Sequence, residues 1–259
     1  MIRGEIGRRG QAITIWVIIA IALIGSMILF FSIERPGVEI DIGEGNEFFP
    51  SRFIEKCARD AVNDAVDLML PHGGFVDDKN SIMYNGINIS YLCLNKGNYG
   101  PCVSQHPSLL NDLKEEVIRN SEERIGVCFD LLKEEVESRW GTITIGEMNN
   151  EIDFAFNRIF LTINRKIVIE KQGNTERFDK FDIEIINSLY DLALIGNEIS
   201  SEEAKYCYFE YVGYNVLHQR FDIEKTTVNE GTKIYSIKDK ETEKEMNLAI
   251  RGCAIPAGL

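Results

Sequence analysis

The chain has 259 residues and is strongly acidic, with 41 Asp and Glu against 28 Lys and Arg and a formal net charge of −13. An acidic protein repels phosphate groups, so nucleic acid is excluded as a partner and binding to anionic lipid head groups is disfavoured. Most of the negative charge follows residue 36, which is typical of an exposed domain kept soluble by self-repulsion.

The first predicted element is a run of 22 uncharged residues, Ala12–Ile33. At about 1.5 Å per residue it makes a helix of roughly 33 Å, enough to cross a hydrocarbon core of about 30 Å. Arg3, Arg8 and Arg9 precede it and favour a cytoplasmic amino terminus. We therefore expect a single-pass protein of the cell membrane, with residues 1–11 as a basic cytoplasmic leader and the carboxyl portion outside the cell. A cleaved secretory peptide is the main alternative, but its apolar region is shorter, about 7–15 residues.

The sequence Arg8-Arg9-Gly10-Gln11 followed by the apolar run resembles the class III signal peptide of archaeal type IV pilin-like proteins. The resemblance covers residues 1–35. It implies that a membrane peptidase cuts between Gly10 and Gln11 and leaves the helix as an anchor or filament core. It also implies that the helix contacts the lipid bilayer and copies of itself or other surface proteins.

One residue departs from this family pattern. Members that polymerise commonly carry Glu five residues into the mature chain, whereas this chain has Ile15. A terminal amine buried without a charged partner is costly, so Ile15 weighs against a filament. The overall layout is also similar to uncharacterised membrane proteins of small-genome archaea, which have a pilin-like anchor and a mixed α/β exterior domain.

All six cysteines follow the predicted anchor, which indicates disulfides in an oxidising compartment. Cys93 and Cys102 enclose a loop rich in Gly, Asn and Pro, and their bond is expected to contribute roughly 2–3 kcal/mol. The pairs Cys57–Cys128 and Cys207–Cys253 then remain, among fifteen possible pairings of six cysteines. A zinc site is the alternative, but the chain has no Cys-x-x-Cys pair.

After the anchor, residues 34–46 are predicted to be a linker and residues 50–70 a helix that ends at Pro71. Residues 75–107 are predicted to form short strands, with a hairpin at Asn85-Gly86. Asn88-Ile89-Ser90 is an N-glycosylation sequon in this region, and both a glycan on Asn88 and an unmodified asparagine stay open.

The following segments alternate between helical and strand periodicity. Residues 108–139 are predicted to be helical with a break at Asn120-Ser121, and their glutamates, including Glu116, to face water. A three-stranded antiparallel meander is expected over residues 143–169, with turns at Asn149-Asn150 and Asn157-Arg158. A helix is then predicted over residues 182–199, followed by a second helix that starts at a Ser200–Glu203 capping box. Strands are predicted at residues 220–228, 233–238 and 246–253.

Because helices and strands are grouped, the fold class is α+β: a transmembrane helix followed by a mixed domain of helices and antiparallel sheet over residues 47–259. That length allows one domain or two that divide near residue 140. The chain also contains a dense group of aromatic residues, predicted to be core with hydroxyls at the rim rather than an exposed interface. Its members are Tyr206, Tyr208, Phe209, Tyr211, Tyr214 and Phe221.

No residue pattern indicates an enzyme. The histidines His72, His106 and His218 belong to no zinc-protease motif, and the chain has no nucleophile elbow or phosphate loop. Asp77-Asp78 lacks the pattern of a calcium loop. We therefore expect no catalytic residue, metal or cofactor. The sequence favours a pilin-like, membrane-anchored cell-surface protein with a structural, adhesive or assembly role. The alternatives are a non-polymerising anchored binding or sensory module and, third, a surface hydrolase.

Overall fold

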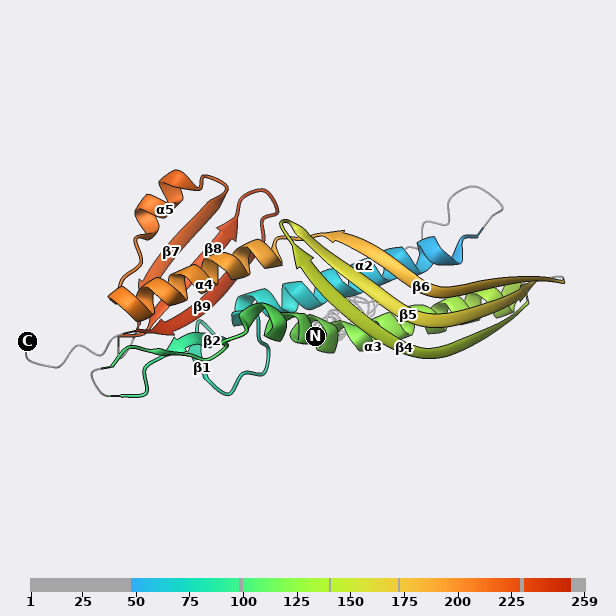
Figure 1. Cartoon of the computed structure of the whole chain (residues 1–259), viewed down its shortest axis with the longest axis horizontal. Helices are drawn as coiled ribbons and strands as arrows, with labels where there is room; N and C mark the ends of the chain where they lie inside the picture. The colour runs from blue at the N-terminus through green and yellow to red at the C-terminus, as the bar shows by residue number, and fades with distance from the viewer. Residues whose placement is uncertain (1–47, 98–99, 140, 172, 229–230, 253–259) are drawn as a thin grey trace, which may run out of the picture. The chain divides into compact units, whose positions relative to one another are not determined.

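The computed structural model describes residues 48–97, 100–139, 141–171, 173–228 and 231–252 (Figure 1). Residues Phe49–Leu259 make up one compact unit, separate from Met1–Phe48. The predicted leader, membrane span and linker, including Gly10 and Gln11, lie outside the described residues. Among the residues that are described, no helix is long and apolar enough to cross a membrane.

The first two long helices of the unit are α2 (Pro50–Met69) and α3 (Leu109–Arg139), which pack against each other. Proline at the first helical position of α2 fits the start of a helix, where its missing N–H is not needed. A short 3₁₀ helix, η1 (Leu70–His72), follows and ends at Gly73 in the left-handed conformation. The predicted helix over residues 50–70 is thus confirmed.

The predicted break in the second helix is wrong, because α3 is continuous over 31 residues. The side chains that suggested a break bond back into the helix. Asn120 Nδ2 donates to the carbonyl of Glu116 at 2.8 Å, and Ser121 Oγ donates to the carbonyl of Val117 at 2.7 Å. Glu116 is buried rather than water-facing, and its carboxylate accepts the backbone N–H of Val76 at 3.2 Å.

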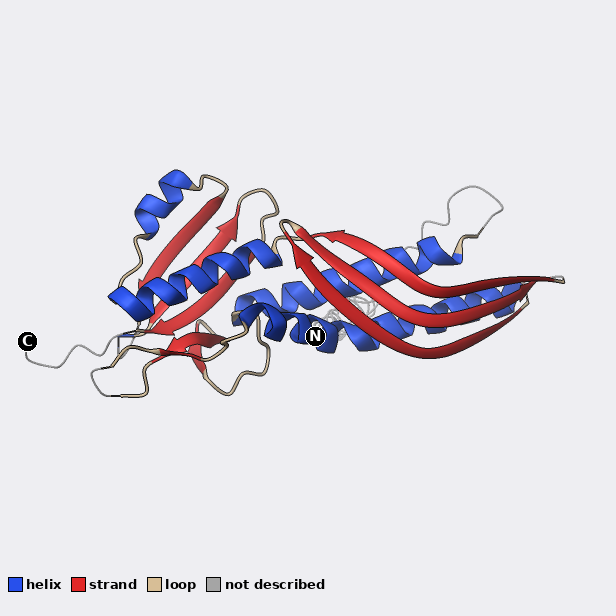
Figure 2. Ribbon diagram, in the orientation of Figure 1, coloured by secondary structure: helices blue, strands red, loops and turns tan. Residues whose placement is uncertain are grey.

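Three long strands form an antiparallel meander in the order β4-β5-β6, with α3 packed on β4 and α2 on β6 (Figure 2). They are β4 (Thr142–Ala155), β5 (Arg158–Lys171) and β6 (Asn174–Ile186). The antiparallel hairpin at Asn157-Arg158 is confirmed, but the predicted meander is otherwise wrong. The first two predicted strands are parts of β4, the third is β5, and β6 was not predicted. Asn149 and Asn150 lie inside β4 and pair with Asn164 and Ile163, so they form no turn.

The second sheet is mixed, with strand order β1-β2-β9-β8-β7 and a short β3 beside β2. Its strands are β1 (Ser81–Tyr84), β2 (Ile87–Leu94), β3 (Val103–Ser104), β7 (Phe221–Thr227), β8 (Lys233–Asp239) and β9 (Glu245–Arg251). The Asn85-Gly86 hairpin is confirmed, and both residues have the positive φ that such a tight turn needs. The expected purely antiparallel pairing is wrong at one place, because β2 and β9 are parallel.

Helix α4 (Leu189–Tyr206) packs on β2, β8 and β9, and the short α5 (Tyr211–Leu217) packs on β7. The predicted helix start at residue 182 is wrong, because the chain stays paired with β5 as far as Ile186. The predicted capping box is also wrong. Ser200 and Glu203 are both buried inside α4, where neither begins a helix.

Candidate functional site

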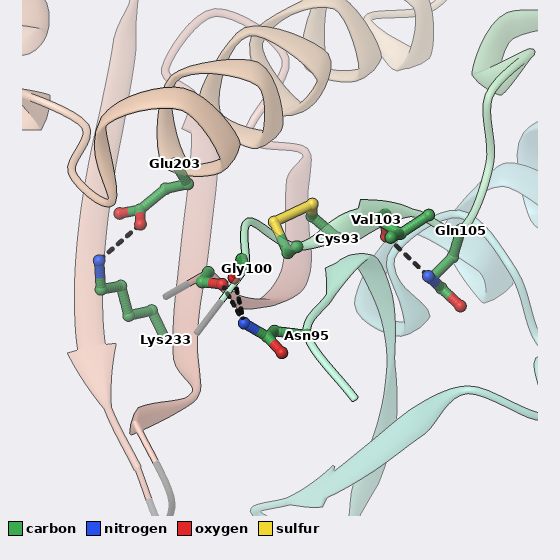
Figure 3. The surroundings of a disulfide bond; sticks show 9 residues. Cys93, Asn95, Gly100, Val103, Gln105, Glu203 and Lys233 are labelled. Atoms are coloured by element: carbon green, nitrogen blue, oxygen red, sulfur yellow. Dashed lines mark hydrogen bonds and ion pairs between the residues drawn. A yellow bond between two sulfur atoms is a disulfide. The ribbon is translucent and has the colours of Figure 1, made fainter. Parts of the chain in front are cut away.

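The described cysteines are all oxidised. Cys57 is bonded to Cys128, joining α2 to α3, and Cys93 is bonded to Cys102, closing the loop between β2 and β3 (Figure 3). Cys207 is also disulfide-bonded, while Cys253 lies outside the described residues. The prediction of disulfides is therefore confirmed for these two pairs.

The loop closed by Cys93–Cys102 is held to the end of β9 by Asn95, which is buried (Figure 3). Asn95 Nδ2 donates to the carbonyls of Gly100 at 2.6 Å and Gly252 at 3.3 Å. Its backbone N–H donates to the carbonyl of Arg251 at 2.9 Å. A single asparagine therefore fixes the disulfide loop against the strand that is parallel to β2.

The sequon lies on β2 next to the hairpin, with Asn88 exposed and opposite Met83. Its hydroxyl residue is in a different environment, because Ser90 is fully buried and its Oγ donates to the carbonyl of Phe75 at 3.1 Å. A glycan on Asn88 fits the folded surface. An enzyme that must contact Ser90 has to act before β2 joins the sheet.

Two variants separate glycosylation at Asn88 from the structural role of the buried Ser90. We expect Asn88→Gln to abolish any glycan mass shift and leave stability within about 0.5 kcal/mol, as for most surface changes. Ser90→Ala should abolish the same mass shift and also cost about 1 kcal/mol, because it removes a buried hydrogen bond. Glycopeptide mass spectrometry and urea unfolding measure the two effects, and an equal stability loss in both variants would contradict the assignment.

A buried carboxylate lies beneath the end of α4 (Figure 3). Glu203 is fully buried and accepts hydrogen bonds from Lys233 Nζ at 2.5 Å and from the hydroxyl of Tyr235. Lys233 also donates to the carbonyl of Cys207 at 2.7 Å. Burial, and then the hydrogen bond to Glu203, raises the pKa of Tyr235. The phenol is therefore a neutral donor, and the ion pair joins α4 to β8.

Removing the charge of this carboxylate tests that structural role. We expect Glu203→Gln to lower the free energy of unfolding by about 2 kcal/mol, because a charged hydrogen-bond partner of Lys233 is lost. Tyr235→Phe should cost about 1 kcal/mol, since it removes one neutral donor and leaves the ion pair intact. Urea unfolding of both variants shows which one loses more stability. A larger loss for Tyr235→Phe than for Glu203→Gln would show that the ion pair contributes little.

His106 is enclosed by two carboxylates. Its ring nitrogens lie 3.3 Å from Asp78 Oδ2 and 3.4 Å from Asp112 Oδ2, and the ring stacks on Phe75 with centroids 3.7 Å apart. These contacts fasten the segment after β3 to the start of α3. Across the described residues, no group of three or more His, Cys, Asp or Glu side chains is arranged to hold a metal ion.

Some of the aromatic residues predicted to be core are buried, and others are exposed. Phe209 and Phe221 are buried, but Tyr206 and Tyr208 are 57% and 48% exposed. α5 contains no buried residue, and its Val216 and Leu217 are 69% and 80% exposed. We refer to the exposed side chains of this region as the α5 surface, which comprises Tyr206, Tyr208, Val212, Val216 and Leu217.

Polar contacts hold α5 in place while its apolar side chains face outward. Asn215 Oδ1 accepts the N–H of Ile223 at 2.9 Å, and Asn215 Nδ2 donates to the carbonyl of Ile223 at 3.0 Å. The amide thus completes part of the free edge of β7, which would otherwise expose backbone groups. Glu210 caps α5 by accepting the N–H of Gly213 at 3.2 Å.

Two tyrosines near α5, Tyr208 and Tyr214, have raised pKa values. The hydroxyl of Tyr208 donates to Glu210 at 2.5 Å, which raises the pKa of Tyr208 and lowers that of Glu210. Burial, and then Glu198, raises the pKa of Tyr214 to about 12. Lys225 Nζ lies 4.8 Å from the ring centroids of both Tyr208 and Tyr211, within the range of a cation–π contact.

This arrangement is an exposed apolar and aromatic surface. Its apolar and aromatic side chains are exposed, whereas the Tyr208 hydroxyl and the Asn215 amide already have hydrogen-bond partners. The sequence analysis identified the aromatic residues but did not predict that Val212, Val216 and Leu217 are exposed. These three residues lie on α5, a helix of seven residues with none buried. No protein-family model, no curated protein and no solved structure matches this chain.

Proposed function

We propose that this chain is a membrane-anchored cell-surface protein, with residues 49–259 outside the cell and a structural, adhesive or assembly role. The observation that carries the proposal is the α5 surface. Large apolar side chains gathered at one place on a protein commonly mark a contact site, and α5 is held by polar contacts that leave these side chains outward. The surface therefore fits a protein that acts by binding another macromolecule.

The disulfides support an exterior location. Bonds of this kind form and persist in oxidising compartments and are rare in the cytosol. Ala12–Ile33 supplies the proposed anchor, and the Gly10-Gln11 junction supplies the proposed cleavage site of a pilin-like protein. The proposed partners of that helix are the lipid bilayer, other copies and other surface proteins.

Processing and location are tested on the full chain in its own cells. We expect membrane fractionation to recover it with the bilayer, and protease added to intact cells to digest residues after 48. Mass spectrometry of the mature amino terminus should find Gln11 as the first residue. Recovery of the untruncated chain as soluble cytosolic protein would contradict both the anchor and the exterior location.

The contact role is tested at the α5 surface. We expect Val216→Asp combined with Leu217→Asp to reduce cell adhesion or assembly several-fold, while unfolding stability stays within about 0.5 kcal/mol because both side chains are exposed. Val103→Asp is the matched control, since Val103 is 68% exposed on β3. Counting retained cells measures the effect, and equal adhesion in all three strains would contradict a role for this surface.

A second candidate is an anchored binding or sensory module that does not polymerise. Ile15 favours it, because the glutamate common in polymerising pilin-like proteins is absent at that position. Electron microscopy with label on this chain separates the two candidates. Label along filaments indicates polymerisation, whereas label scattered singly over the envelope indicates the module.

A further inference from the structure

One of the two outer strands of the meander, β6, is long and is paired on one side. Among the residues that the structure describes, β6 pairs with β5 alone, so the other side of its 13 residues is a free edge (Figure 1). Residues 174–177, 179 and 180 are exposed, and Phe178 between them is partly buried. A free edge presents backbone N–H and C=O groups that can pair with another strand.

The exposed part of this edge has a self-complementary order of charges. Residues 176–180 read Glu-Arg-Phe-Asp-Lys. When two such strands run antiparallel with Phe178 at the centre, Glu176 lies opposite Lys180 of the partner subunit. Arg177 then lies opposite Asp179 of the partner subunit. The two-fold axis repeats both contacts, and opposite charges across an antiparallel pair are stabilising.

Neighbouring registers are unfavourable. Centring the pair on Arg177 sets two arginines opposite each other, and centring it on Asp179 sets two aspartates opposite each other. Like charges directly opposite are destabilising. Natural edge strands commonly carry charge to prevent pairing, but here the signs alternate in an order that repels only the shifted registers.

These charges are available for contact with another chain. In the described part of the structure, the side chains of Glu176, Arg177 and Asp179 make no hydrogen bond or ion pair, and Lys180 pairs only with the exposed Asp182. The register between β5 and β6 shifts between Phe178 and Lys180, and such irregularities increase the local twist. The contacts would therefore be ion pairs between long, flexible side chains, added to backbone pairing.

We infer that two copies of this chain associate through the β6 edges, antiparallel and centred on Phe178, so that two three-stranded meanders form one six-stranded sheet. This inference goes beyond the proposed function, because the pairing needs neither the membrane helix nor the α5 surface. A two-fold contact of this kind is closed, so it yields dimers rather than open filaments.

The test is a charge swap on the full chain in detergent, with mass measured by light scattering. We expect dimers that dissociate at about 1 M salt, where the screening length is only about 3 Å. Glu176→Lys should weaken the dimer about tenfold or more, because it places two lysines opposite each other on both sides of the axis. Adding Lys180→Glu to it restores opposite charges, so the double variant should bind within about threefold of the wild type.

A cross-link gives a second, independent measurement in membranes. Phe178→Cys places a thiol at the two-fold axis, and we expect a disulfide-linked dimer on non-reducing gels. Lys166→Cys is the matched control, because Lys166 is an exposed residue of the central strand β5, and it should stay monomeric. The inference is overturned if the double charge variant fails to recover the dimer, or if both cysteine variants cross-link equally. Neither result would bear on the cellular location or on the α5 surface.

Discussion

Replacing Asp239 by asparagine is expected to lower the free energy of unfolding by about 3–5 kcal/mol, the usual cost of leaving a buried charge without its partner. Asp239 is fully buried at the end of β8 and accepts two hydrogen bonds from Arg220, at 3.0 Å from Nε and 2.6 Å from Nη2. It also accepts the N–H of Glu241 and the hydroxyl of Thr242, both at 3.0 Å. Urea unfolding at pH 7 measures the loss.

A second aspartate beside the same arginine serves as the matched control. Asp191 Oδ2 lies 3.6 Å from Arg220 Nη2, and its Oδ1 has no hydrogen-bond partner among the described atoms. Burial raises the pKa of Asp191, although the N–H of Asn157 and then Arg220 oppose the shift. We expect Asp191→Asn to change stability by less than about 1 kcal/mol. Equal losses for the two variants would contradict this division of roles.

The contributions of Asp239 and Asp191 to the free energy of unfolding should change with pH in opposite directions. Burial alone would raise the pKa of Asp239, but the hydrogen bonds from Arg220, Glu241 and Thr242 outweigh it and lower the pKa. Its stabilisation is therefore present above the unfolded value of about 3.9 and is lost as pH falls through the lower, folded value. The curves of wild type and Asp239→Asn should converge in strong acid.

The raised pKa of Asp191 has the reverse consequence. The folded state binds its proton more tightly than the unfolded state, so stability decreases as pH rises from about 3.9 through the folded value. Relative to wild type, Asp191→Asn should therefore improve over that same window. Unfolding curves taken from about pH 2 to pH 7 check both signs, because the window of Asp239 lies below about 3.9 and that of Asp191 above it.

Removing the Cys57–Cys128 disulfide is expected to cost about 4 kcal/mol, whereas removing Cys93–Cys102 should cost about 2.5 kcal/mol. The difference follows from the unfolded chain, because the first bond closes a loop with a sequence separation of 71 and the second a separation of 9. Cross-linking a longer loop removes more conformational entropy from the unfolded state. Double cysteine-to-alanine variants measured by urea unfolding give both values.

Which of the two disulfides costs more stability to remove is a sharper test than either value alone. If Cys93–Cys102 proved the more costly to remove, the contacts of Asn95 with Gly100 and Gly252 would depend on the disulfide. Asn95→Ala in the intact protein is the control, because it breaks the same contacts while keeping both disulfides. A loss in that variant close to that of the Cys93–Cys102 variant would assign the effect to the asparagine.

The sequence correctly predicted the turns and helix ends that depend on one or two neighbouring residues. Asn85-Gly86 specifies a tight hairpin because both positions need a positive φ, and Pro50 and Pro71 flank α2 because proline suits a helix start and stops its continuation. The Cys93–Cys102 pair also followed from local composition, since Gly, Asn and Pro make its loop easy to close, whereas Cys57–Cys128 was one of the pairs left over.

Local signals failed where distant contacts decide. Asn120 and Ser121 look like a cap but bond to their own helix, and Asn149-Asn150 looks like a turn but lies in a strand fixed by β5. Glu203 resembles a capping residue, yet its partners Lys233 and Tyr235 are about thirty residues away on β8. A buried carboxylate of this kind cannot be recognised without knowing which strand lies beneath the helix.

The parallel pairing of β2 with β9 sets the order in which the second sheet is completed. β2 ends at Leu94, whereas β9, which pairs with it in parallel, begins only at Glu245. A chain that emerges from its amino end therefore makes the β1–β2 hairpin long before the strand that must cover it. During that interval the inner edge of β2 is open to aggregation or to a chaperone, and the last strand to arrive closes the centre of the sheet.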